Sequence, residues 1–172
     1  MRENRRTQIV SSAVALARAD GLDAVTYDAI ARRLGISKAG VVYHFPQRGD
    51  VLRAMVEQTT SEVAGAVERH HEQTGKPRMV SYVILLLDGV IRPESPGLST
   101  AIATDGALAR GWRDLLATWT EELAATGVDP DDVRTGYLAA TAGVWALEPG
   151  QLAGVRRTIL ELLSNTKPKK AS

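Results

Sequence analysis

Apolar residues recur along most of the chain at the three- and four-residue spacing of amphipathic helices. Near the N-terminus this stripe consists of Ile9, Val10, Ala13, Leu16 and Ala17, which share one face of a helix. No alternating apolar run is bounded by hairpin turn residues, so the pattern predicts no β-strand. We therefore predict an all-α fold of about nine helices, without an internal repeat.

Capping and breaking residues divide this pattern into short helices followed by longer ones. Gly21 and Gly35 are placed to end the first and second helices, and Thr26 and Ser37 are placed to cap the second and third helices. Pro46 ends the third helix, because the residue before a proline disfavours helical backbone. The first helix is predicted to end at residue 20. A later helix begins at residue 77 or 78 and includes the apolar run 83–87. The other predicted helices cover residues 27–34, 38–45, 48–71, 98–109, 112–125, 131–147 and 151–163.

Composition excludes several classes of protein. The chain has 172 residues and no cysteine, which excludes disulfide scaffolds, thiolate zinc sites and cysteine nucleophiles. No apolar run approaches the ~20 residues of a membrane span. The N-terminal sequence Met-Arg-Glu-Asn-Arg-Arg-Thr has no apolar signal core. We expect a cytoplasmic protein.

The net charge of +1 hides an uneven distribution. Residues 1–53 hold nine Lys or Arg against five Asp or Glu, whereas residues 54–166 hold nine against fifteen. Residues 166–172 read as a basic, disordered tail. A basic N-terminal region followed by an acidic remainder is typical of a protein whose N-terminal region binds a polyanion, although uneven surface charge also arises without any function.

Two short helices joined by Leu34-Gly35-Ile36-Ser37 form a helix-turn-helix pattern. The second helix of such a unit enters the major groove of DNA. The side chains expected to be exposed on that helix are Ser37, Lys38, Ala39, Gly40, Val42, Tyr43 and His44. Helix pairs joined by a glycine turn also occur in all-α proteins that bind no DNA, so the turn alone leaves both interpretations open.

A longer string makes the pattern more specific. Residues 26–52 read TYDAIARRLGISKAGVVYHFPQRGDVL. This string closely resembles the DNA-binding signature of the tetracycline-repressor-like (TetR) family of bacterial transcriptional regulators. The matching positions are Thr26, Ile30, Ala31, Leu34, Gly35, Ser37, Gly40, Tyr43, His44, Phe45, Pro46, Arg48 and Leu52. The resemblance covers about residues 5–55, and beyond residue 55 only the length and the number of helices agree.

The resemblance implies roles for the matching residues. Thr26 and Tyr27 meet a phosphate at the start of the second helix, Tyr43 and His44 contact the DNA backbone, and Arg48 holds another phosphate. Ser37, Lys38 and Ala39 lie along the groove, where small residues at positions 39 and 40 let the backbone come close to DNA. The DNA-binding residues implied are therefore Thr26, Tyr27, Ser37, Lys38, Ala39, Gly40, Tyr43, His44 and Arg48.

Phosphate contacts fix register rather than sequence, and among these residues only Lys38 has the reach for guanine. We therefore expect specificity to rest partly on DNA shape and on an arm of Arg2, Arg5 and Arg6 in a minor groove. A frayed, solvated terminus is the alternative for this arm.

The resemblance also implies a homodimer formed by the last two long helices, here 137–147 and 152–163. Gly136, Ala139, Ala140, Ala142 and Gly143 permit close helix approach, although packing within one chain would use them equally well. A dimer places two recognition helices ~34–36 Å apart, which predicts a palindromic operator.

A ligand cavity in the body is implied as well. Its candidate wall residues are Tyr82, Trp112, Trp119 and Trp145, and ordinary core packing is the alternative for each of them. Asp88 and Asp105 are candidates for pairing with a cationic ligand, with plain solvent exposure as the alternative.

Catalytic and metal sites are not expected. His70 and His71 are adjacent, so on a helix they point ~100° apart and cannot chelate one metal together. The chain contains no phosphate loop, GxSxG or HExxH motif. We expect no enzyme activity, no metal and no cofactor.

These observations predict a helix-turn-helix DNA-binding domain over residues 1–47, a helical ligand-binding and dimerisation domain over 48–165, and the tail. The expected function is a ligand-responsive repressor released from its operator by an unknown small molecule, with activator action equally open. The alternative is an all-α dimeric small-molecule-binding protein whose DNA motif is weakened, because Gln47 is a poor helix cap and Gly49 disfavours the first turn.

Overall fold

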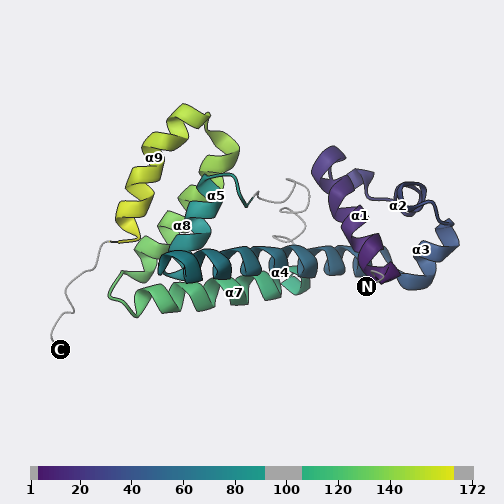
Figure 1. The fold of residues 1–172 in the computed structure, drawn as a ribbon, viewed down its shortest axis with the longest axis horizontal. Helices are drawn as coiled ribbons and strands as arrows, with labels where there is room; N and C mark the ends of the chain where they lie inside the picture. The colour runs from purple at the N-terminus through teal and green to yellow at the C-terminus, as the bar shows by residue number, and fades with distance from the viewer. Residues whose placement is uncertain (1–3, 92–105, 165–172) are drawn as a thin grey trace. The chain divides into compact units, whose positions relative to one another are not determined.

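The computed structural model describes residues 4–91 and 106–164 of the chain. Within these ranges it contains α-helices, one 3-10 helix (η1) and no β-strand (Figure 1). In chain order the elements are α1 (Arg5–Asp20), η1 (Leu22–Ala24), α2 (Tyr27–Leu34), α3 (Lys38–His44), α4 (Arg48–Thr74), α5 (Arg78–Leu87), α7 (Gly106–Ala124), α8 (Pro130–Ala146) and α9 (Pro149–Leu162). The predicted all-α fold is confirmed.

The chain divides into two compact units. The first, here called the head, comprises residues 1–61 and 94–112, and the second, the body, comprises residues 62–93 and 113–172. The long helix α4 therefore contributes its first half to the head and its second half to the body.

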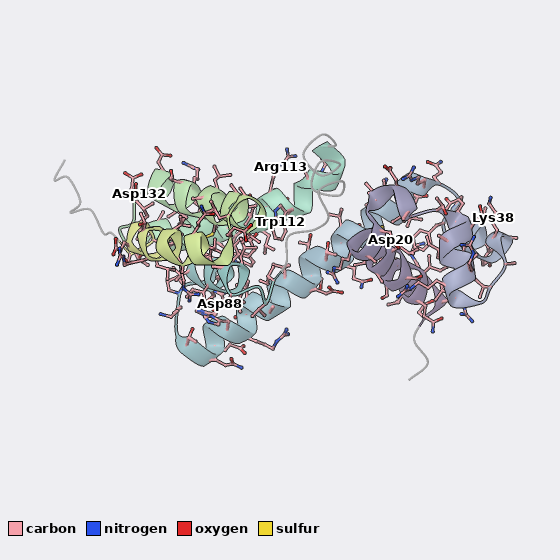
Figure 2. The ribbon with its side chains drawn as sticks, turned by 90° about the horizontal axis from the view of Figure 1, so that it is seen from above. Asp20, Lys38, Asp88, Trp112, Arg113 and Asp132 are labelled. Atoms are coloured by element: carbon pink, nitrogen blue, oxygen red, sulfur yellow. The ribbon has the colours of Figure 1, made fainter. Side chains whose placement is uncertain are left out.

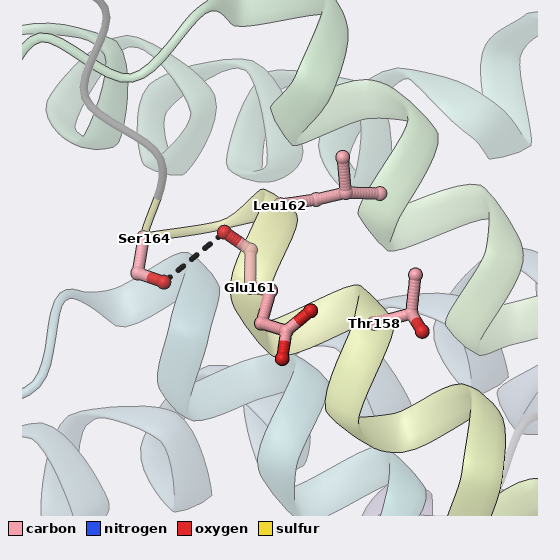
Figure 3. A pocket seen from close by; sticks show the side chains of 4 residues that line it. All are labelled: Thr158, Glu161, Leu162 and Ser164. Carbon is pink, nitrogen blue, oxygen red and sulfur yellow. Dashed lines mark hydrogen bonds between the residues drawn. The ribbon is translucent and has the colours of Figure 1, made fainter.

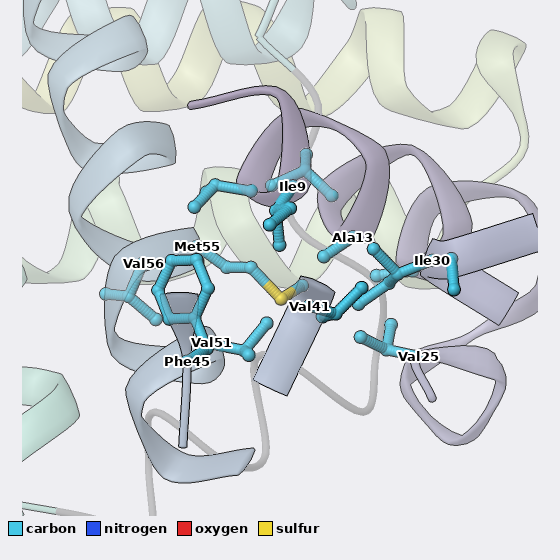
Figure 4. Packing of buried hydrophobic residues seen from close by; sticks show 13 residues of the cluster. Ile9, Ala13, Val25, Ile30, Val41, Phe45, Val51, Met55 and Val56 are labelled. Atoms are coloured by element: carbon cyan, nitrogen blue, oxygen red, sulfur yellow. The ribbon is translucent and has the colours of Figure 1, made fainter. Parts of the chain in front are cut away.

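The head is built around a cluster of buried apolar side chains (Figure 4). α1 supplies Ile9 and Ala13, which are fully buried, and α4 supplies Val51 and Met55. Phe45, directly after α3, is also fully buried among them. The stripe predicted on the first helix is thus the face that α1 turns toward the core.

The body is built around α5, α8 and α9, which pack against one another. Seven of the ten residues of α5 are buried, as its all-round apolar sequence predicts. α8 and α9 come close because Gly136 and Gly143 have no side chains at their contact. A Cβ at Gly136 would lie 3.0 Å from Leu163 Cδ2, and one at Gly143 would lie 3.2 Å from Leu152 Cδ1.

One predicted boundary is wrong. We expected one helix to end at Ala109 and another to begin at Trp112, but α7 continues through Gly111 as a single helix. A glycine costs a helix interior only about 1 kcal/mol, and no proline removes a backbone donor there. Residues 98–105 of the expected earlier helix, with Asp105, lie outside the described residues.

The N-terminus also differs from the expectation. Asn4 caps α1 by accepting a hydrogen bond from the Arg6 amide at 3.1 Å, so Arg5 and Arg6 are the first helical residues. The predicted arm is wrong for Arg6, whose side chain is held by the His44 carbonyl and the Phe45 ring. Arg5 is an exposed residue of the first turn of α1, where a DNA contact stays a prediction, and Arg2 lies outside the described residues.

Candidate nucleic-acid interface

Local capping positions both helices of the helix-turn-helix pattern. The Thr26 hydroxyl oxygen accepts a hydrogen bond from the Ala29 amide at 3.1 Å, and that of Ser37 accepts one from the Gly40 amide at 3.1 Å. Between them Gly35 ends α2 with φ 64°, a left-handed conformation that glycine adopts without strain. Both predicted caps and the predicted glycine turn are confirmed.

α3 has one buried and one exposed face. Val41 is fully buried in the head core, whereas Lys38, Ala39, Val42 and Tyr43 are exposed. Tyr43 is 82% exposed, and its ring meets the His44 ring edge-on with centroids 5.2 Å apart. An aromatic side chain so far out of the core contributes little to folding, which makes it available to a partner.

Side chains from two other helices hold the C-terminal end of α3. Arg6 Nη1 donates to the His44 carbonyl at 2.9 Å, and its guanidinium carbon lies 4.1 Å from the centre of the Phe45 ring. The Tyr27 hydroxyl donates to the Phe45 carbonyl at 2.7 Å. Burial, with a smaller contribution from the charge of Asp50, raises the pKa of Tyr27 above its usual value. α3 is thus tied at both ends, by its own cap and by α1 and α2.

A hollow of about 230 Å³ lies beside α3 and brings four predicted DNA-binding residues together. Thr26 and Tyr27 come from the start of α2, Lys38 from the start of α3, and Arg48 from the start of α4. The Arg48 guanidinium is exposed, with Nη2 3.5 Å from the Leu22 carbonyl oxygen. Arg48 and the N-terminus of α2 beside one hollow can hold an anion such as a phosphate.

The same hollow contains a carboxylate whose partner the sequence did not reveal. Lys38 Nζ donates to Asp28 Oδ2 at 2.8 Å, which joins α3 to α2. Figure 2 shows Lys38 at the outside of the head. The position of Asp28 in the first turn of α2 predicts a favourable interaction with the helix end. The local sequence does not indicate the ion pair with Lys38.

The other predicted DNA-binding residues, Ser37, Ala39, Gly40, Tyr43 and His44, lie along α3 itself or immediately before it. A Cβ at Gly40 would make only ordinary contacts, 3.5 Å from Ser37 Oγ and 3.9 Å from Ile36 Cδ1. The fold therefore does not require glycine at position 40.

In the body, two of the predicted ligand-binding residues lie together. Tyr82 and Trp119 are both buried, with ring centroids 5.7 Å apart, and the Tyr137 ring lies 6.2 Å from Tyr82. Burial raises the pKa of Tyr82 above its usual value. Trp112 is half-buried and belongs to the head rather than the body, so the structure does not group it with Tyr82 and Trp119. The side chain of Trp145 lies outside the described residues. Asp88 pairs with Arg156 of α9.

The described part of the chain shows no metal-binding cluster and no helix suited to a membrane. In residues 4–91 and 106–164, no group of three or more His, Asp or Glu side chains is arranged to hold a metal ion. None of the helices in the described part of the chain is both long and apolar enough to cross a membrane.

The sequence of the head matches a known family. Residues 9–55 match the profile described as bacterial regulatory proteins, tetR family. No curated protein matches the chain.

Solved structures share the fold over nearly the whole chain. A transcriptional regulator from Rhodococcus sp. Rha1 is 15% identical, with 93% of this chain and 96% of that one covered and a TM-score of 0.73. A regulator of the TetR/AcrR family from Thermobifida fusca YX-ER1 is 26% identical, with 96% and 100% covered and a TM-score of 0.64. The multidrug binding protein EbrR, complexed with imidazole, is 17% identical, with 98% and 99% covered and a TM-score of 0.65.

Proposed function

Because residues 9–55 are a TetR-family domain on a chain with the fold of that family's transcriptional regulators, we propose that this protein is a ligand-responsive repressor. In this proposal a homodimer binds a palindromic operator in the cytoplasm and leaves it when a small molecule occupies the body. The observation that carries the proposal is the exposed face of α3, which is fixed at both ends and carries a tyrosine that is 82% exposed. The proposal includes no catalytic step.

The hollow beside α3 supports a phosphate contact. Thr26, Tyr27 and Arg48 line it, and the start of α2 adds the partial positive charge of a helix end. Tyr43 and His44 then contact the backbone further along α3. Such contacts set the register of the recognition helix in the groove.

The exposed surface of α8 and α9 supports the dimer. Leu138 on α8 is 58% exposed, and an open hollow of about 420 Å³ on α9 is lined by Thr158, Glu161, Leu162 and Ser164 (Figure 3). Gly136 and Gly143 are already used in the contact between α8 and α9 of one chain. The second copy therefore meets Leu138 and neighbouring exposed residues such as Ala142 rather than these glycines.

The effector site is proposed in the body, with Tyr82, Trp119 and Trp145 as its candidate wall, since Trp112 belongs to the head. The multidrug binding protein EbrR, whose structure holds imidazole, has the same fold and supports a small-molecule effector here. Since Tyr82 and Trp119 are buried, an effector that reaches them must change tryptophan fluorescence, which provides a screen.

The first experiment is to incubate the purified protein with a pool of random DNA duplexes and to sequence what it retains. An enriched palindrome is the expected result. With roughly 6–8 phosphates neutralised per dimer, the slope of log affinity against log salt is expected to be about −5 to −7. Tyr43→Ala should weaken binding while the circular dichroism spectrum stays unchanged.

The pairing of Lys38 with Asp28 favours a second candidate, because it leaves less free positive charge on α3. In that case the protein is a dimeric small-molecule-binding protein that selects no DNA. A folded dimer that enriches no sequence at low salt establishes this alternative.

A further inference from the structure

The exposed face of α3 offers DNA one charged side chain, and that side chain is already paired. Along α3 the exposed residues are Lys38, Ala39, Val42 and Tyr43. Lys38 Nζ lies 2.8 Å from Asp28 Oδ2, with the two side chains 58% and 60% exposed. An exposed ion pair in water contributes little free energy, so in the free protein the paired and separated states of Lys38 and Asp28 have similar free energies.

The approach of DNA decides it. Asp28 lies in the first turn of α2, two residues after Thr26, and lines the same hollow as Thr26 and Arg48. A carboxylate in that place faces the phosphates if Lys38 turns away toward a base. Because DNA is a dense polyanion, an unpaired carboxylate close to it is repelled, while a neutral Lys38–Asp28 pair is not. The negative charge of DNA therefore favours the state in which Lys38 stays paired with Asp28.

With Lys38 retained, the side chains left to meet base edges are apolar. Ala39 and Val42 are three residues apart and so share one side of the helix. Val42 is 37% exposed although it is apolar, and it follows a fully buried Val41. In the major groove the feature that an apolar side chain recognises is the C5-methyl group of thymine.

We propose that this protein reads its operator half-site through thymine methyl groups, contacted by Ala39 and Val42, while Asp28 holds Lys38 as an internal counter-ion rather than a guanine reader. The inference rests on the proposed DNA-binding function and names the bases that this function recognises. It gives Asp28 a positioning role, since it acts through Lys38.

The first test replaces thymidine by deoxyuridine in the duplex that the protein retains from the random pool. The substitution preserves base pairing and removes only the methyl group. Affinity is expected to fall about fourfold for each contacted methyl, hence about sixteenfold when one contacted methyl is removed from each half-site of a palindrome. Deoxyuridine outside the half-sites is the control. Replacing guanine by 7-deazaguanine, which removes the N7 acceptor in the major groove, should change affinity little.

The second test separates the two roles of Lys38. K38M leaves the Asp28 carboxylate uncompensated and should weaken binding about tenfold. D28N/K38M replaces the pair by two uncharged side chains, so binding should return to within about threefold of the unaltered protein. If Lys38 reads guanine, K38M removes the sensitivity to 7-deazaguanine that the unaltered protein then shows, whereas methyl readout leaves both proteins equally insensitive to it. K76M is the matched control, because Lys76 is an exposed lysine of the body, between α4 and α5, that belongs to neither proposed interface.

The outcomes distinguish the inference from the function on which it rests. Loss of affinity with deoxyuridine, together with rescue by D28N/K38M, supports methyl readout. A retained palindrome that is insensitive to deoxyuridine and sensitive to 7-deazaguanine overturns methyl readout while the regulator function stands. If a folded dimer retains no sequence at all, the proposed function falls and methyl readout falls with it.

Discussion

In the head, the 13 buried residues of the core cluster all lie within residues 9–56, whereas in the body α5 packs against α8 and α9, which begin at Pro130 and Pro149. Each short helix of the head begins at a side-chain cap or ends at a glycine within a few residues of it. The body depends instead on contacts between segments far apart in the chain. Local sequence therefore carries most of the information for the head and much less for the body.

Charged residues differ between the units in the same way. In the head, the Lys38–Asp28 pair is exposed on both sides and faces the proposed DNA. In the body, Arg78 at the start of α5 binds Glu68 of α4 at 2.6 Å and Glu122 of α7 at 3.2 Å. This one guanidinium joins three helices. The Arg78 pairs connect three helices within the body, whereas the Lys38–Asp28 pair connects two helices of the head and lies on the surface proposed to meet DNA.

The largest effect is expected from Phe45→Ala. Phe45 is fully buried in the head core, and its ring supports the Arg6 guanidinium, so truncation should destabilise the head by about 3–5 kcal/mol. Hydrogen exchange measured by mass spectrometry should show faster exchange over residues 9–55 and little change over α5. Phe45→Leu should cause a smaller loss. Equal acceleration over α5 would break the contrast between the units.

A smaller effect is expected from Gly136→Ala in the body. The new Cβ would lie 3.0 Å from Leu163 Cδ2 and 3.2 Å from Cγ, and Leu163 is itself buried, so it has little room to move. We expect a loss of about 1–3 kcal/mol by urea unfolding, net of the gain in helix propensity.

Gly111→Ala on α7 is the matched control, because a Cβ there meets nothing within 4 Å. It should stabilise the protein by up to ~1 kcal/mol. A stabilising Gly136→Ala would mean that α8 and α9 separate readily, which contradicts a body held by close helix contacts.

The features of the head were easier to predict from the sequence than those of the body, because they depend on local contacts. The caps at Thr26 and Ser37 and the turn at Gly35 were predictable, because each depends on backbone atoms no more than five residues away. The resemblance of residues 26–52 then identified the candidate interface. In the body, by contrast, the sequence indicated that α5 is central but not which helices cover it.

The pairs that the sequence did not predict join residues on different helices. Lys38 and Asp28 are ten positions apart, and their contact depends on the angle between α2 and α3. Arg78 meets Glu122 forty-four positions away, once α5 and α7 have packed. The break expected at Gly111 was wrong for a related reason. Glycine lowers helix propensity by a small amount, which the rest of a 19-residue helix outweighs.

An effect of about 1 kcal/mol is expected from Ser37→Ala. The substitution removes the acceptor of the Gly40 amide at the start of α3 and should cost 0.5–2 kcal/mol. Because α3 has only seven residues, losing its cap should also increase exchange of its amides. Ser37→Asp keeps an acceptor and should restore stability, but it places a negative charge where DNA approaches. A variant with normal stability and weak DNA binding would link the cap position to function.

The smallest effect is expected from Glu68→Gln, and it should be visible mainly as a change in pH dependence. The hydrogen bond from Arg78, assisted by the charges of Arg78 and His71 and opposed by desolvation, lowers the pKa of Glu68 from its usual value of 4.5. A carboxylate whose pKa is lower in the folded state stabilises the protein above the unfolded-state pKa, and this contribution is lost as the pH falls toward the folded-state pKa. The free energy of unfolding of the unaltered protein, measured with urea, should therefore fall below about pH 4.5, and Glu68→Gln should flatten that decline.

The control is Glu72→Gln, which alters an exposed glutamate one turn further along α4 and should leave the pH dependence of the free energy of unfolding unchanged. If both variants behave alike, the ion pairs of Arg78 do not hold the body together, and its stability rests on the apolar contacts of α5, α8 and α9 alone.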